Sequence, residues 1–213
     1  SRVWARGRDM EVRLWLAALC CFAAFVVLGL LVAYPPVPKI DAQTIVFRGQ
    51  ATQLAVLFTQ SGRTVPLVAL SVIAVIVFWA AKSNVFVPIV ILLSQTVSQG
   101  AIEGAKQFFH RTRPDQWLVR HEIGYSYPSG HAATAIVFYA AWFLVVWQSP
   151  LPKGLKVPLL CILGIWVLGV SWSRIALGAH YFTDVLGGTL FGIAWLCIGV
   201  SLARHIALFR KVL

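Results

Sequence analysis

The sequence has few charged side chains. Of its 213 residues 12% are Asp, Glu, Lys or Arg, and only 7 are acidic. A soluble domain needs roughly twice that charged fraction, about 25%, to cover its surface. With 59% hydrophobic residues and a mean hydropathy of +0.80, the chain is also too apolar for a disordered segment. These features exclude an ordinary soluble domain and indicate an integral membrane protein.

Cysteine is scarce as well. The four cysteines are Cys20, Cys21, Cys161 and Cys197, and each lies inside an apolar run. They lack the spacing of metal ligands or of a disulfide-stapled secreted module. We expect buried, unreactive thiols that pack as small apolar side chains.

Six long uncharged runs separate the charges that are present. A helix rises about 1.5 Å per residue, so about 20 apolar residues cross the hydrocarbon core of a bilayer. The runs predict membrane-spanning helices at Leu14–Tyr34, Val65–Ala81, Val85–Phe109, Ala132–Trp147, Val157–Trp172 and Tyr181–Ala203. The first run is longer than the apolar core of a signal peptide, about 7–15 residues, so we expect it to be retained. The segment Pro35–Thr64 is either an interfacial helix or a structured loop.

No repeat or linker divides the chain, and we therefore expect one all-α domain over residues 1–213, an integral membrane bundle of six transmembrane helices. Gly188 and Gly192 form a pair of small residues that we expect to pack inside this bundle. His110 and His121 in an outer loop, and Trp117 near a span end, are typical of membrane-interface residues.

The positive charge is distributed between the spans. The net charge is +11, but the cations do not form a single stripe, so we expect anionic membrane lipids and not nucleic acid as partners. Six spans place both termini on one side, with ten of the 18 Lys and Arg residues, against eight on the other side. Assigning three of those eight to substrate binding leaves ten against five. The positive-inside rule then predicts cytoplasmic termini.

One span carries polar residues along a single face. Gln95, Gln99, Glu103 and Lys106 recur at steps of four, four and three residues. Polar groups in a span normally face the bundle interior, because lipid cannot form hydrogen bonds with them. Two interpretations remain open: the glutamines form interhelical hydrogen bonds, or the face lines a polar cavity that leads to Lys106.

The same span ends in a basic cluster. Lys106 and Arg113 are seven residues apart and would share a face if the helix continued, whereas Pro114 disfavours helix at Arg113. In either case two cations lie at the membrane boundary on the side opposite the termini. Basic residues commonly flank spans, so this cluster alone identifies no site.

A second cluster, Ser129-Gly130-His131, directly precedes the fourth span. The start of a helix offers unpaired N–H groups to an anion, and glycine permits close approach of the backbone. The alternative is that Ser129 only caps the helix and His131 is an ordinary interfacial residue.

The third cluster joins the last two spans and contains Arg174, His180 and Asp184. On a helix, His180 and Asp184 would lie on one face, since they are four residues apart. A carboxylate that accepts from one imidazole nitrogen leaves the other nitrogen free to attack an electrophile. Arg174 adds a planar cation that suits a phosphate group.

These three clusters resemble, in order and in internal spacing, the three signature motifs of the type 2 phosphatidic acid phosphatase (PAP2) family. The patterns are Lys-x6-Arg-Pro, Pro-Ser-Gly-His and Ser-Arg-x5-His-x3-Asp, and they are matched without departure at residues 106–114, 128–131 and 173–184. The resemblance implies a six-span membrane lipid phosphatase similar to bacterial phosphatidylglycerophosphate and undecaprenyl-diphosphate phosphatases.

The resemblance also implies roles for the residues. His180 would attack phosphorus and form a phosphohistidine, Asp184 would orient its imidazole, and His131 would protonate the leaving oxygen and then activate water. The residues implied to bind the phosphoryl oxygens are Lys106, Arg113, Ser129, Gly130 and Arg174. We expect no cofactor and no metal, since three cations would offset the charge and the acidic residues on this side are scattered along the sequence.

The expected substrate is a lipid monophosphate or diphosphate, such as phosphatidylglycerophosphate, phosphatidic acid or undecaprenyl diphosphate. The expected location is the bacterial inner membrane, with the site at the outer, periplasmic face. Two alternatives remain open: a lipid phosphotransferase that uses the same intermediate, and a non-catalytic protein that binds or moves lipids. Vanadium haloperoxidases share the anion-binding motifs but are soluble proteins. The oligomeric state remains open.

Overall fold

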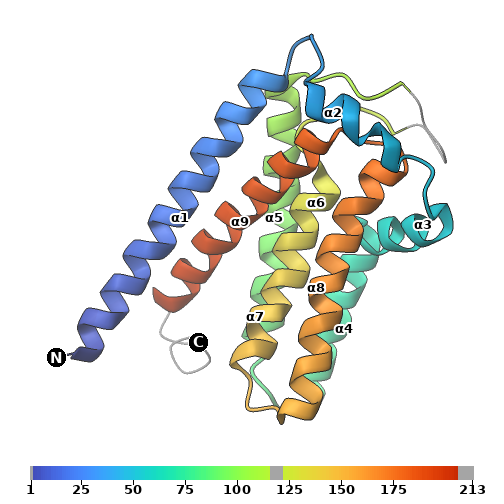
Figure 1. Cartoon of the computed structure of the whole chain (residues 1–213). Coiled ribbons are helices and arrows are strands. Elements are labelled where there is room, and N and C mark those ends of the chain that lie inside the picture. Colours follow the sequence, from blue (N-terminus) through green and yellow to red (C-terminus); the bar gives the residue numbers. More distant parts are fainter. Residues whose placement is uncertain (1, 116–121, 206–213) are drawn as a thin grey trace.

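The computed structural model describes residues 2–115 and 122–205, and this part of the chain is helical with no strand (Figure 1). Its elements are α1 (Arg2–Val32), α2 (Lys39–Gln43), η1 (Thr44–Phe47), α3 (Thr52–Ser61), α4 (Thr64–Ala80), α5 (Phe86–Phe109), α6 (Gly130–Ala135), η2 (Ile136–Ala140), α7 (Ala141–Gln148), α8 (Lys153–Ala176) and α9 (Phe182–His205). The predicted all-α fold is confirmed. Residues of the sequence analysis that lie outside the described ranges are His121, Trp117 and three of the counted cations, Arg120, Arg210 and Lys211.

Five segments of the described chain are long and apolar enough to cross a membrane. They are the part of α1 from Asp9 to Val32, α5, the continuous segment Gly130–Gln148, α8 and α9. A sixth candidate is the pair α3 and α4, whose axes are bent by 53° at the break between them. The predicted second span corresponds to α4, which has 17 residues. Five or six candidate spans therefore agree with the six predicted ones.

The fourth span is not a regular α-helix. Between α6 and α7 the chain forms one π-helical turn, η2, whose residues Ile136 to Tyr139 are all buried. Such turns insert a residue into the helical ladder and rotate the faces before and after it relative to one another. Nothing in this run of apolar side chains distinguishes the turn in the sequence.

Glycines allow α9 to pack closely against α6 and η2. A Cβ atom on Gly188 would lie 2.3 Å from the carbonyl oxygen of Ser129, and one on Gly192 would lie 2.7 Å from Cβ of Ile136. Both distances are far below van der Waals contact, so only glycine fits at these positions. The expectation that this pair packs inside the bundle is confirmed, and Figure 1 shows α9 lying between α1 and α6.

An aromatic cluster joins α1 to the segment that precedes α6. The Tyr127 ring stacks on Phe25 with centroids 5.6 Å apart and meets Phe109 edge-on at 5.0 Å. The Tyr127 hydroxyl donates a 2.6 Å hydrogen bond to the carbonyl oxygen of Phe25. Buried aromatic pairs of this geometry contribute about 0.5–1.5 kcal/mol beyond their buried area. The cluster thus fixes the backbone directly before Ser129.

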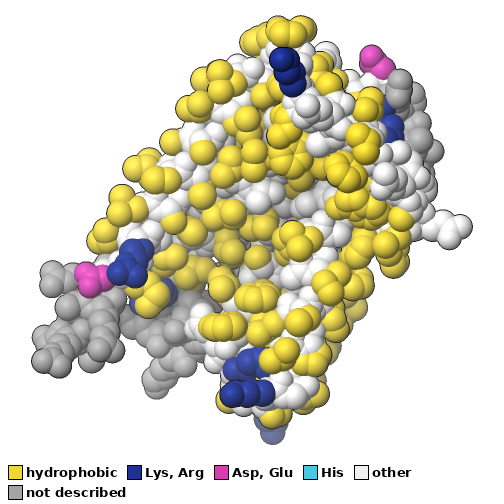
Figure 2. Space-filling model, viewed as in Figure 1, with side chains coloured by type: hydrophobic (Ala, Val, Ile, Leu, Met, Phe, Trp, Pro, Cys, Tyr) yellow, Lys and Arg dark blue, Asp and Glu magenta, His cyan; other side chains and the backbone are white. Residues whose placement is uncertain are grey.

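The lateral surface is apolar. Figure 2 shows hydrophobic side chains over the visible length of the helices and Lys and Arg side chains near the two ends of the bundle. Large side chains such as Leu31, Trp79 and Leu168 are more than two-thirds exposed, as expected for residues that contact lipid. The expectation of buried thiols is wrong for Cys20 and Cys161, which are exposed on this surface, while Cys21 and Cys197 are half-buried.

Candidate active site

A polar cavity of about 250 Å³ lies where the three sequence clusters meet. It is at the end of the bundle opposite the start of α1 and the end of α9 (Figure 1). Six of the eight predicted site residues line it: Lys106, Arg113, Gly130, His131, Arg174 and His180. The other two, Ser129 and Asp184, are fully buried beside it.

His180 presents one imidazole nitrogen to this cavity. Its Nε2 lies 3.0 Å from Nη1 of Arg113. A guanidinium can only donate hydrogen bonds, so Nε2 must accept, and the ring proton is on Nδ1. Burial, and secondarily the positive charge of Arg113, hold the pKa of His180 well below its usual value. The imidazole is therefore neutral at neutral pH, with a lone pair directed toward the cations.

Asp184 lies on the other side of the imidazole. His180 precedes α9 while Asp184 lies in its first turn, and Oδ2 of Asp184 is 3.5 Å from Nδ1 of His180. That distance exceeds the usual hydrogen-bond range of about 2.7–3.2 Å. The same oxygen accepts shorter bonds from the Ser126 hydroxyl at 2.5 Å and from the Tyr181 N–H at 2.8 Å. Because Ser126 Oγ is also 3.5 Å from Nδ1, the hydroxyl and the carboxylate together face the imidazole.

Arg111 binds Oδ1, the other carboxylate oxygen of Asp184, and the sequence analysis missed this role. Its Nη1 donates to Oδ1 of Asp184 at 2.6 Å and to the Thr183 hydroxyl at 2.7 Å, and its Nη2 donates to Oδ2 of Asp41 at 2.8 Å. Asp41 in turn accepts from the N–H of Thr183 at 2.9 Å. Arg111, Asp41 and Asp184 are all buried. Asp41 is 70 residues from Arg111 in sequence, and no spacing rule connects two residues so far apart.

The three predicted cations reach the cavity from different elements. Helix α5 ends at Phe109, and His110 adopts a left-handed conformation, so Lys106 and Arg113 do not share a helical face. Arg113 enters from the loop, where its Nε donates to the carbonyl oxygen of Gly124 at 2.9 Å. Desolvation by burial lowers the pKa of Arg113 from its usual value. The convergence of the two cations follows from the loop and not from helix periodicity.

Arg174 is almost completely buried, with 2% of its surface exposed. Its Nη1 donates to the Thr59 hydroxyl, and its Nη2 donates to Oε1 of Glu122 at 3.1 Å. Glu122 also lines the cavity. The Glu122 carboxylate therefore accepts a hydrogen bond from Arg174 at the place where an anionic ligand would bind.

The second cluster begins α6. Ser129 is the N-cap, and its hydroxyl accepts a long hydrogen bond of 3.5 Å from the N–H of Ala132, so the capping interpretation holds for this side chain. Gly130 lines the cavity, and a Cβ atom there would lie 4.0 Å from Nζ of Lys106. His131 also lines it, and its Nε2 is buried with no hydrogen-bond partner among the described residues. An unpaired buried nitrogen beside a cavity is available to a ligand.

Both interpretations of the polar face of α5 apply, each to a different part of the helix. The Gln95 carbonyl accepts a 3.4 Å hydrogen bond from the Ser71 hydroxyl of α4, which is an interhelical contact. The Gln99 amide donates to the Thr134 hydroxyl at 2.6 Å, and both residues line the cavity together with Glu103 and Lys106. The part of the face nearer the end of α5 therefore forms a wall of the cavity.

Within residues 2–115 and 122–205, no three His, Cys, Asp or Glu side chains are grouped so that they could hold a metal ion. The charged groups around the cavity are mainly cations, which favour an anionic ligand.

Residues 84–206 match the family model of the PAP2 superfamily, and the chain belongs to this superfamily. It is 36% identical over 108 residues to phosphatidylglycerophosphatase B of Bacillus subtilis strain 168, covering 50% of this chain and 53% of that protein. It is 33% identical over 94 residues to phosphatidylglycerophosphatase B of Escherichia coli K12 (43% and 35%). It is 33% identical over 117 residues to lipid A 1-phosphatase of Rhizobium johnstonii (49% and 43%). These alignments span about half or less of the relatives' length.

A solved structure has a similar fold. The crystal structure of a transmembrane PAP2 type phosphatidylglycerolphosphate phosphatase from Bacillus subtilis superposes with a TM-score of 0.73. The match covers 89% of this chain and 96% of that one, at 24% sequence identity. It shows that the chain has the fold of a transmembrane PAP2 protein.

The Arg111→Met variant tests the buried network. Methionine keeps most of the volume but leaves both carboxyl groups without their cation, and breaking a buried ion pair costs about 3–5 kcal/mol. We expect the free energy of unfolding, measured by denaturation in detergent micelles, to fall by that amount. The control is Lys39→Met, which removes an exposed cation close to Asp41.

Adding Asp41→Asn to the Arg111→Met variant removes one of the two stranded carboxylates, and part of the stability should return. Equal stability of Arg111→Met and the wild type would show that the network contributes nothing to the fold.

Proposed function

We propose that this protein is a lipid phosphate phosphatase that hydrolyses lipid monophosphates or diphosphates through a phosphohistidine. The observation that carries the proposal is the position of His180, whose Nε2 lies 3.0 Å from Nη1 of Arg113 at a cavity lined by Lys106, Arg113 and Arg174. A nucleophile beside fixed positive charge suits attack on a phosphate ester, because the cations stabilise the charge of the transition state.

The reaction would proceed in two displacements. Nε2 of His180 attacks phosphorus, the P–N bond forms as the ester P–O bond breaks, and His131 donates a proton to the leaving oxygen. His131 then takes a proton from a water molecule that attacks phosphorus, the P–N bond breaks, and phosphate is released. The unpaired Nε2 of His131 in the cavity wall supports this role. Asp184, held by Arg111 and Ser126, would stabilise the imidazolium character of the His180 ring.

Substrate binding would replace some of the contacts within the site. The phosphoryl oxygens would replace Nε2 of His180 as the acceptor of the Arg113 hydrogen bond. They would also compete with the Glu122 carboxylate for the hydrogen bond from Arg174. The N–H of Gly130 at the start of α6 would contribute a further donor. The predicted role of the Ser129 hydroxyl in binding phosphate would require it to turn away from Ala132.

The position of the cavity supports a lipid substrate. It lies at the end of the spans, at the depth of lipid headgroups, so the tail of the substrate would stay in the bilayer. Phosphatidylglycerophosphate is the first substrate to test, because two of the similar proteins are named phosphatidylglycerophosphatase B. Phosphatidic acid and undecaprenyl diphosphate are the other two lipids to test.

The distribution of charge supports an orientation in the bacterial inner membrane with cytoplasmic termini. The side that carries the termini has ten of the 18 Lys and Arg residues. Four of the eight on the opposite side, Arg63, Lys106, Arg113 and Arg174, line the cavity. The active site would therefore face the periplasm.

Phosphate release from the three lipids in mixed micelles tests the activity. The wild type should release inorganic phosphate from at least one of them, and His180→Ala should release none above the background without enzyme. Asp184→Asn keeps the shape of the side chain but weakens its interaction with the imidazole, and we expect a loss of turnover of about 10²-fold or more.

Following ³²P from a labelled lipid distinguishes a hydrolase from a phosphotransferase and from a protein that only binds lipid. Trapping of ³²P on the wild type, and none on His180→Ala, is the expected result. Lipid binding without any phosphate release by the wild type would rule out the hydrolase, and transfer of label to a second lipid would identify a phosphotransferase.

Removal of divalent metal tests the role given to the three cations. Lys106, Arg113 and Arg174 would offset the phosphoryl charge themselves, so millimolar EDTA should leave the initial rate unchanged. Orthovanadate, which adopts the pentacoordinate geometry of the transition state, should inhibit in competition with substrate. Loss of activity with EDTA and recovery with Mg²⁺ would contradict a metal-independent site.

Cysteine accessibility tests the orientation. In a variant with the four native cysteines replaced by Ala, Asp115→Cys should react with a membrane-impermeant maleimide added to intact cells. Lys153→Cys, at the exposed start of α8, should react only after the cells are permeabilised. The reverse pattern would invert the topology.

A further inference from the structure

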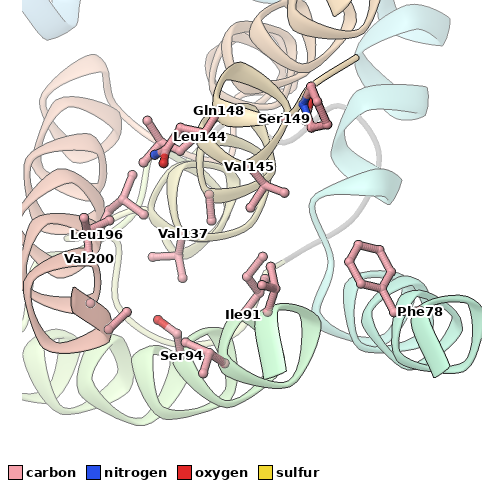
Figure 3. A pocket seen from close by; sticks show the side chains of 16 residues that line it. Phe78, Ile91, Ser94, Val137, Leu144, Val145, Gln148, Ser149, Leu196 and Val200 are labelled. Atoms are coloured by element: carbon pink, nitrogen blue, oxygen red, sulfur yellow. The ribbon is translucent and has the colours of Figure 1, made fainter. Parts of the chain in front are cut away.

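A second, larger cavity of about 460 Å³ lies in the half of the bundle nearer the termini. Its lining comes from α4, α5, η2, α7 and α9. Figure 3 shows side chains from three walls around the space, among them Ile91, Val137, Val145, Leu196 and Val200. None of these residues belongs to the polar site around His180.

The cavity has few polar groups that could form hydrogen bonds with water. Among the side chains that line it, only Ser94, Gln148 and Ser149 are polar. The Ser94 hydroxyl accepts a 3.0 Å hydrogen bond from Nε1 of Trp195, and the Ser149 hydroxyl donates one of 2.6 Å to the carbonyl oxygen of Val146. A buried water needs two to four polar partners, and apolar cavities without them stay dry. An apolar molecule therefore suits this lining better than water does.

The space is also wide. A Cβ atom on Gly199, which lines the cavity, would meet only Oγ of Ser94, at 3.9 Å. Protein interiors are close-packed, and an unfilled space of this size would forfeit dispersion contacts along its whole lining. Leu144, Val145, Leu196 and Val200 are only partly buried, so the cavity communicates with the surface of the bundle.

The depth of the cavity matches one leaflet of a bilayer. Its lining runs along the fourth span from Val137 to Gln148. At about 1.5 Å per residue this stretch covers roughly 16 Å, about half of the hydrocarbon core of about 30 Å. The apolar molecules at that depth are the acyl chains of the leaflet on the side of the termini.

Cations lie at the end of the cavity that is nearer the membrane surface on the side of the termini. Lys82 lies four residues after the lining residue Phe78, just beyond the end of α4, and Lys153 and Lys156 follow the lining residues of the turn after α7. Nζ of Lys156 donates a 3.2 Å hydrogen bond to the carbonyl oxygen of Trp147. Neither residues 78–90 nor residues 144–157 contain an acid. Figure 2 shows Lys and Arg side chains gathered at this lower end.

We propose that this cavity is a binding site for an anionic phospholipid of the leaflet on the side of the termini. One acyl chain fills the apolar space, and the phosphate lies near Lys82, Lys153 and Lys156. The charge of those lysines selects an anionic headgroup over a zwitterionic one. This lipid is distinct from a substrate, since the site is at the opposite end of the bundle from His180.

Native mass spectrometry of the purified full chain, delipidated in detergent and titrated with dioleoyl phosphatidylglycerol, tests the site. Gly199→Leu places a bulky side chain in the cavity, and its Cβ atom would meet no neighbour closer than 3.9 Å. The matched control is Gly164→Leu on α8, which lies outside the cavity and where a Cβ atom has no neighbour within 4 Å. Gly199→Leu should lower the affinity for the tightest-bound lipid by about tenfold or more, and Gly164→Leu should leave it unchanged.

A second titration, with dioleoyl phosphatidylcholine, tests the headgroup. The wild type should bind it more weakly than phosphatidylglycerol, and Lys153→Gln with Lys156→Gln should reduce that difference. Equal binding of phosphatidylglycerol to the wild type and Gly199→Leu would overturn the site, as would a dimer that Gly199→Leu alone abolishes. Equal affinity of the wild type for both lipids would overturn the anionic selectivity.

Discussion

Arg111 donates hydrogen bonds to the carboxyl groups of Asp41 and Asp184 in a region from which water is excluded, and the arrangement of the candidate site depends on these contacts. Taking a charged group out of water costs several kcal/mol, which is recovered only when its geometry and hydrogen bonds are complete. Arg111 uses both terminal nitrogens, and Thr183 bonds to Asp41 through its N–H and its hydroxyl. The network joins the loop after α5, helix α2 and the start of α9.

The consequences of this network extend to the imidazole. Oδ2 of Asp184, the oxygen nearer His180, accepts hydrogen bonds from the Ser126 hydroxyl and from the backbone N–H of Tyr181. The backbone N–H of Ser129 also donates to the carbonyl oxygen of Asp184 at 2.9 Å. One buried guanidinium thus positions the element that carries His180 relative to the element that carries His131. This is the kind of supporting contact that keeps a reactive group in one orientation.

The two cavities of the bundle differ in chemistry because of their depth. Near the membrane boundary, cations and imidazoles line a polar pocket, whereas at the depth of the acyl chains the lining is almost wholly apolar. The segment Gly130–Gln148 contributes to both, with Thr134 in the polar pocket and Val137 in the apolar cavity. The π-helical turn begins between these two residues. One span thus contributes side chains to both cavities, on either side of the start of that turn.

The sequence by itself determined the membrane class, the approximate spans and the placement of Lys106, Arg113, His131, Arg174 and His180 on one side of the membrane. These follow from rules that act over short distances along the chain: the length of apolar runs, and motifs whose residues stand within about three helical turns of one another. Only the tertiary structure decided that Arg111 and Asp41 support Asp184, that the Ser129 hydroxyl caps α6, and that the imidazole of His180 meets its carboxylate at 3.5 Å. Those contacts join residues far apart in sequence or depend on differences in distance of less than an ångström. Both are set by how the helices and loops pack against each other, which one sequence does not encode in any local pattern.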